Sequence, residues 1–176
     1  MEHRGRLYLL TLLLVVASAA QARVFMTQQQ ALASAFPTAA KVTRQTFFLT
    51  KQQLDDARRE SGVMFTGQMV IRYIATVDDK VLGYAYFDTH LVRTFPESVL
   101  IVVTPDGRVN RIEILSFDEP TEYFPKRRWI DQIAGRKLDS ELSLNRAIRP
   151  LSGASLTAQA IVNASRKVLA LHHVIR

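Results

Sequence analysis

The residues best suited to chemistry are Ser152-Gly153-Ala154-Ser155-Leu156-Thr157, which follow Pro150 and open an apolar helical pattern. Ser152 is a favourable N-cap residue, and this spacing predicts a helix that begins directly after it. The first turn of a helix presents unpaired N–H groups and the positive end of the helix dipole, where a phosphate can bind. Gly153 and Ala154 would let a ligand approach the backbone, and Ser155 and Thr157 add hydroxyl groups. The alternative interpretation is an ordinary helix cap without a ligand.

This hexapeptide resembles the Ser-Gly-Ala-Thr-x-Thr motif of the FMN-binding domain family, which includes periplasmic flavin-carrying subunits of sodium-pumping and Rnf-type electron-transfer complexes. The resemblance implies FMN as cofactor, joined through its phosphate to the hydroxyl of Ser155 by a flavin transferase that uses FAD. It also marks Ser152, Gly153, Ala154, Leu156 and Thr157 as cofactor-binding positions. The chain departs from the motif twice: Ser155 stands where threonine is usual, and Arg149 stands where an acidic residue is frequent.

The similarity extends over residues 80–171. Glu119-Pro120 occupies the place of the flavin-adjacent loop of the relatives, and Tyr123 and Trp129 follow it. Aromatic side chains commonly line cofactor pockets, so these two either wall an isoalloxazine ring or cover the sheet. Arg93 is the residue nearby that is best suited to an anionic group.

A second group of polar residues lies between two predicted strands and comprises Asp88, His90, Arg93 and Glu97. It is interpreted either as a site that faces the flavin or a partner, or as a hydrogen-bonded network at the strand ends, and the network is favoured. His172 and His173 are adjacent and cannot share a ligand on a helix, so they are interpreted as a basic, frayed helix end.

Several other chemistries are excluded or disfavoured. The chain has no cysteine, which excludes disulfides, thiolate metal sites and a cysteine nucleophile. A hydrolase that uses Ser155 as nucleophile is disfavoured because no motif places a histidine base beside it. No P-loop or dinucleotide fingerprint is present.

Residues 1–22 have the order of a secretory signal peptide. Arg4 and Arg6 precede an apolar run, and Ala20-x-Ala22 predicts cleavage before Arg23. The expected location is therefore the periplasm, with an uncleaved membrane anchor as the alternative. The net charge of +7 suits an anionic ligand or surface. Nucleic acid is not an expected partner, because the arginines are dispersed rather than gathered on one face.

The mature chain is predicted to have an α+β fold, an antiparallel sheet covered by N-terminal helices and a C-terminal amphipathic helix. Capping-box patterns predict helices that begin at Thr27 and Thr50. Pro105-Asp106-Gly107 predicts a tight turn. Runs of β-favouring residues joined by short turns predict paired strands, at 42–49, 69–77, 81–87, 98–104 and 109–116. The last helix is expected to bury the stripe Leu156, Ala160, Ala164, Val168 and Leu171.

Two functions are compatible with these features. The first is an exported FMN protein that carries electrons between a membrane donor and an extracytoplasmic acceptor, with a flavin transferase as a further partner. The mature chain would then comprise an N-terminal segment that contains the helices and the first strands (23–79), followed by an FMN-binding domain (80–171). In that function the flavin supplies the redox chemistry, so no catalytic side chain is expected. The alternative is a flavin-free binding or assembly module of an exported complex.

Overall fold

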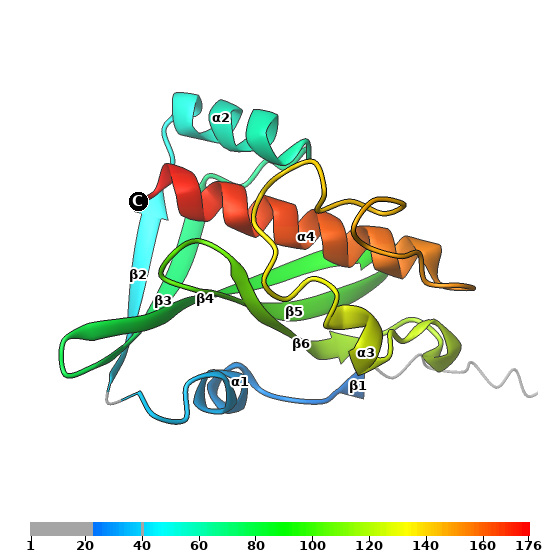
Figure 1. Cartoon of the computed structure of the whole chain (residues 1–176), viewed down its shortest axis with the longest axis horizontal. Coiled ribbons are helices and arrows are strands. Elements are labelled where there is room, and N and C mark those ends of the chain that lie inside the picture. The colour runs from blue at the N-terminus through cyan, green and yellow to red at the C-terminus, as the bar shows by residue number, and fades with distance from the viewer. Residues whose placement is uncertain (1–22, 40) are drawn as a thin grey trace, which may run out of the picture.

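The computed structural model describes residues 23–39 and 41–176. The predicted signal segment, residues 1–22, lies outside the described residues. The fold is α+β, as the sequence predicts: one antiparallel sheet of six strands, in the order β1-β6-β5-β4-β3-β2, with helices on both faces (Figure 1). Within the described ranges, no helix has the length and apolar composition needed to span a membrane. The strands are β1 (Arg23–Val24), β2 (Lys41–Phe48), β3 (Met69–Val77), β4 (Lys80–Val92), β5 (Phe95–Val103) and β6 (Val109–Phe117).

Tight turns join the four central strands. Asp78 and Asp79 both have positive φ angles, 46° and 61°, which is the backbone of the hairpin turn between β3 and β4. Gly107, with φ of 81°, completes the predicted turn between β5 and β6. The pairing of Val103 with Val109 confirms that these two strands are antiparallel.

The hairpin of β4 and β5 is longer than predicted. Its pairing continues through His90 and Glu97 to Val92 and Phe95. Residues that the sequence places between two strands therefore lie on the strands themselves. Arg93, with φ of 54°, lies in the turn that closes the hairpin.

The sheet is covered on both faces (Figure 1). Helices α2 (Lys51–Ser61) and α4 (Ser155–Val174) enclose the larger core, which contains Ile101, Ile112 and Ile161. Helix α1 (Gln28–Ala35) covers the opposite face over a smaller core around Leu100. The single turns η1 (Thr121–Tyr123) and α3 (Arg127–Ile130) lie in the irregular segment after β6.

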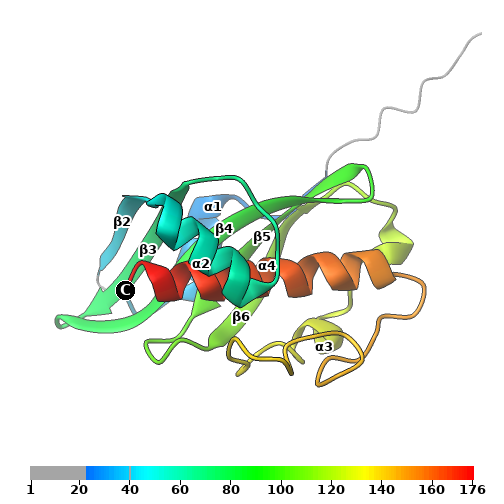
Figure 2. The ribbon, with the colours of Figure 1, turned by 90° about the horizontal axis from the view of Figure 1, so that it is seen from above.

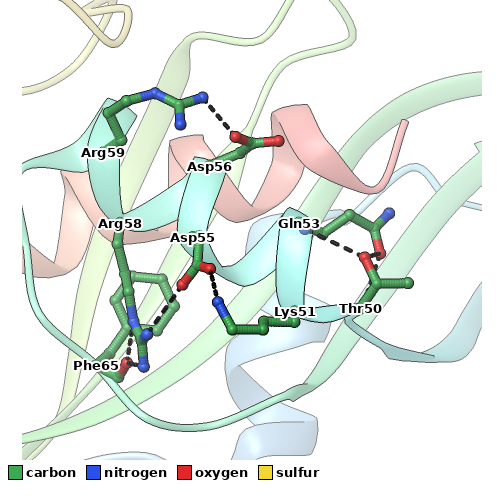
Figure 3. Close-up of polar contacts among 8 residues, drawn as sticks. All are labelled: Thr50, Lys51, Gln53, Asp55, Asp56, Arg58, Arg59 and Phe65. Atoms are coloured by element: carbon green, nitrogen blue, oxygen red, sulfur yellow. Dashed lines mark hydrogen bonds and ion pairs between the residues drawn. The ribbon is translucent and has the colours of Figure 1, made fainter.

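Both predicted capping boxes are present. In α2, Thr50 Oγ1 accepts a hydrogen bond from the N–H of Gln53 at 3.2 Å, and Gln53 Oε1 accepts one from the N–H of Thr50 at 3.0 Å (Figure 3). Gly62 ends the helix in the left-handed conformation, with φ of 67°. Arg58 then donates two hydrogen bonds to the carbonyl of Phe65, which holds the following loop against α2 (Figure 3).

The buried face of α4 differs from the predicted stripe. Ala164, Val168 and Leu171 are buried as expected, but Leu156 is 50% exposed and Ala160 is only partly covered. Additional buried positions are Thr157, Ala158, Ile161, Val162, Ser165, Leu169, Ala170 and His172. The face is broad because α4 packs against both the sheet and α2, as seen from above in Figure 2.

Candidate functional site

Helix α4 begins two residues later than the sequence predicts. Its N-cap is Ala154, and no side chain caps it, so the prediction of Ser152 as the N-cap is wrong. The physical reason is a separate turn: the N–H of Ala154 donates to the carbonyl of Leu151 at 3.1 Å, and Gly153 adopts a positive φ of 79°. Ser152 and Gly153 therefore lie at the corner of that turn. Ser155 is the first residue of the helix rather than the third.

The six residues of the motif separate into an exposed and a buried set. Ser152, Gly153, Ser155 and Leu156 face solvent, whereas Ala154 and Thr157 are buried. A Cβ added at Gly153 would meet nothing within 4 Å, so the space beside the turn is open. The first N–H groups of a helix have no intrahelical partner, and here no side chain takes that role. An exposed hydroxyl and an uncapped helix start therefore occur together at Ser155.

Glu119 lies in the loop after β6, at a cavity of about 350 Å³. The carboxylate is buried, and its Oε1 has no hydrogen-bond partner among the described residues. Phe95 and Phe117 provide apolar walls, and Arg23 provides a positive charge. The remaining lining residues are Asp118, Pro120, Thr121 and Glu122, so none of residues 152–157 contributes to this cavity.

Arg93 is separate from the other members of the expected polar cluster. Its guanidinium lies over the ring of Tyr123, 4.9 Å from the ring centroid, in a cation–π contact. This contact joins the turn between β4 and β5 to η1. Figures 1 and 2 place that turn, η1 and the start of α4 at the same end of the molecule.

The other three residues of the cluster form the favoured network. His90 lies between two carboxylates, with Nδ1 3.0 Å from Asp88 Oδ2 and Nε2 2.9 Å from Glu97 Oε2. Carboxylates accept hydrogen bonds, so this arrangement needs a proton on each ring nitrogen. Lys167 on α4 donates to the second oxygen of Asp88 at 2.5 Å.

The pKa values of this network follow from the same contacts. Burial alone would lower the pKa of His90, but Asp88 and Glu97 outweigh it and raise the pKa to about 9. Burial acts to raise the pKa of Asp88, yet the hydrogen bonds and charges of His90 and Lys167 hold it below its usual range. Burial raises the pKa of Glu97, and His90 only partly opposes this. A cavity of about 190 Å³ adjoins Asp88, His90 and Lys167.

The histidines at the end of α4 are not a frayed end, so that interpretation is wrong. His172 is 2% exposed, and its Nδ1 is hydrogen-bonded to the hydroxyl of Tyr86 at 2.7 Å. Only His173 is exposed, where it contacts Glu60. The burial of His172 could have been predicted from the sequence, because it lies four residues after Val168 and therefore on the same, buried face of the helix. Lys167 had no comparable signal, since its partner Asp88 lies on a distant strand.

Comparisons of the chain with family models, with curated proteins and with solved structures found no match. Among the described residues, no group of three or more histidine or acidic side chains is placed to hold a metal ion. The features that could bind a ligand or take part in a reaction are therefore the exposed start of α4, the Glu119 cavity, the network around His90 and the hydrogen bond between Tyr86 and His172.

Proposed function

We propose that this chain is an exported FMN-binding electron carrier that holds the flavin phosphate at Ser155. The observation that supports this most directly is the start of α4. Ser155 is the exposed first residue of an uncapped helix of 20 residues, next to a glycine turn with open space beside it. A phosphate ester at this hydroxyl would lie beside the unpaired N–H groups of the first turn.

The helix dipole alone is too weak to retain a flavin. A negative charge at an exposed helix start gains about 0.3–1 kcal/mol, which is far below the energy of tight binding. Retention therefore needs a covalent bond to Ser155 or a pocket for the ring. The Glu119 cavity is the candidate pocket, because it combines the loop marked by the family resemblance with aromatic walls.

In this proposal the flavin supplies the electron chemistry, and the protein supplies position and electrostatics. A flavin transferase would form the ester bond from FAD: the Ser155 hydroxyl would lose its proton and bond to the phosphate next to the flavin, and the diphosphate bond of FAD would break to release AMP. The electron donor and acceptor would be redox partners at the membrane or in the periplasm. No catalytic residue is assigned to the chain.

The proposal is tested by expressing the full chain with its signal segment in a host that makes a flavin transferase. We expect a yellow product whose intact mass includes FMN and whose flavin survives denaturation. Ser155→Ala should remove the covalent flavin, and Ser155→Thr should preserve it. Ser140→Ala is the control, because Ser140 is an exposed serine that lies outside the motif and does not line the Glu119 cavity.

Two results would overturn the proposal in different ways. Flavin that stays attached in Ser155→Ala would place the anchor elsewhere. A wild-type chain that never gains the FMN mass, and retains no flavin without denaturation, would make the flavin-free binding or assembly module the better account.

A further inference from the structure

A basic cavity of about 510 Å³ lies between α3 and the segment that leads into α4. Figure 2 shows α3 beside this irregular segment. The volume falls in the usual range for sites of small molecules, roughly 300–1,000 Å³. The lining residues are Arg128, Trp129, Gln132, Arg136, Ala147, Arg149 and Pro150.

The walls of this basic cavity are fixed by hydrogen bonds. The N–H of Arg149 donates to Gln132 Oε1 at 3.0 Å, and the carbonyl of Arg149 accepts from Trp129 Nε1 at 2.8 Å. Arg136 Nε donates to the carbonyl of Gln132 at 3.2 Å. The backbone of residue 149 is thus held on both sides, so binding would need little further ordering of the backbone at this wall.

The charges that line the basic cavity are not balanced within it. It is lined by three arginines and no carboxylate. The guanidinium groups of Arg128 and Arg149 form no hydrogen bond or ion pair with any other residue that the structure describes. Asp131, the acidic residue closest to α3 in the chain, is bonded to Arg127 at 2.8 Å. Neighbouring like charges repel, so an anion between the arginines would be stabilising.

We propose that the basic cavity binds a ligand with two adjacent oxyanion groups, such as a diphosphate. Guanidinium groups match phosphate oxygens in planar, bidentate geometry, and those of Arg128 and Arg149 have no partner among the described residues. The volume exceeds the need of a single oxyanion. The proposal does not depend on flavin binding, because it involves none of residues 152–157.

The single tryptophan of the chain makes the test selective. Trp129 lines the basic cavity and is the only tryptophan, so intrinsic fluorescence reports on this site. We expect inorganic pyrophosphate to change the fluorescence of the full chain saturably, with matching heat in calorimetry. Arg128→Gln and Arg149→Gln should each weaken binding about tenfold, because each removes a charge-assisted contact. Both side chains are exposed, so the variants should keep the wild-type melting temperature.

Arg146→Gln is the matched control, since it removes an equal charge from the same segment at a residue that pairs with Glu141. It should change pyrophosphate affinity by less than about twofold, and Ser155→Ala should leave affinity unchanged. The proposal is overturned if pyrophosphate gives no saturable signal at low ionic strength, or if Arg146→Gln weakens binding as much as Arg149→Gln.

A second arm identifies the source of the ligand with two oxyanion groups. Phosphatidylcholine vesicles that contain cardiolipin present two phosphates on one headgroup. Sedimentation of the wild-type chain with these vesicles, and its loss in Arg149→Gln, would support a lipid headgroup as the ligand. Pyrophosphate binding without vesicle binding that depends on Arg149 would support a soluble phosphorylated molecule.

Discussion

The hydroxyl oxygen of Tyr86 lies 2.7 Å from Nδ1 of His172, and this contact joins the middle of the sheet to the last turn of α4. Both side chains are 2% exposed. The other ring nitrogen, Nε2, is buried without a partner among the described residues. A buried imidazole in this environment is stable only in its neutral form, because a charge there would lack water and a counter-ion.

The first prediction concerns acid stability. Burial lowers the pKa of His172 to about 4, and the charges of Arg176 and Arg72 act in the same direction. The unfolded chain, with a pKa of about 6.5, takes up this proton first. The free energy of unfolding therefore has the full contribution of the neutral ring above pH 6.5. It falls by about 2–3 kcal/mol as the pH falls from 6.5 toward 4. Urea unfolding at pH 7 and pH 4.5 should show a smaller loss in His172→Gln than in the wild type. Equal losses would contradict the prediction.

The second prediction concerns alkaline stability. His90 has a pKa raised to about 9, so its contribution to stability is complete below pH 6.5 and is lost as the pH rises through 9. We expect a fall of about 3 kcal/mol at most in the free energy of unfolding over this range. His90→Gln should be less stable at pH 6 and nearly independent of pH from 6.5 to 9. NMR titration of the His90 ring checks the cause, and a midpoint near 6.5 would refute it.

Local sequence signals predicted much of the fold. The capping boxes at Thr27 and Thr50 and the turn at Gly107 are formed within a few residues, so composition and spacing were sufficient. Pairing within the long hairpin was not predicted, because His90 and Glu97 become neighbours only when the strands continue past the expected ends.

The sequence was less informative where distant segments meet. The buried face of α4 depends on α2, which lies about 100 residues earlier in the chain. Likewise, Tyr86 and His172 are 86 residues apart, and no local pattern links them. Ser152 does not cap α4 as expected, because the N–H of Ala154 donates to the carbonyl of Leu151 instead.

A third prediction concerns export. Cleavage before Arg23 would keep strand β1 intact, where Arg23 pairs with Phe117 and the N–H of Phe25 donates to the carbonyl of Leu115 at 2.7 Å. We expect mass spectrometry of a periplasmic fraction to find a chain that begins at Arg23. Ala22→Arg should block processing, because the cleavage site needs a small residue there. Wild-type protein that retains residues 1–22 and sediments with membranes would favour the anchor instead.

The last prediction concerns Gly83 on β4, where the sheet faces α1. A Cβ at this position would lie 3.0 Å from the backbone oxygen of Val103 and 3.2 Å from Cε1 of Phe36. The oxygen belongs to a paired central strand and cannot move freely, so Gly83→Ala should destabilise the protein by about 1–3 kcal/mol. Gly67→Ala is the control, because a Cβ there meets nothing within 4 Å. Chemical denaturation of both variants should show a lower midpoint for Gly83→Ala alone. A Gly83→Ala protein as stable as Gly67→Ala would show that Phe36 and β5 can shift to admit the methyl group.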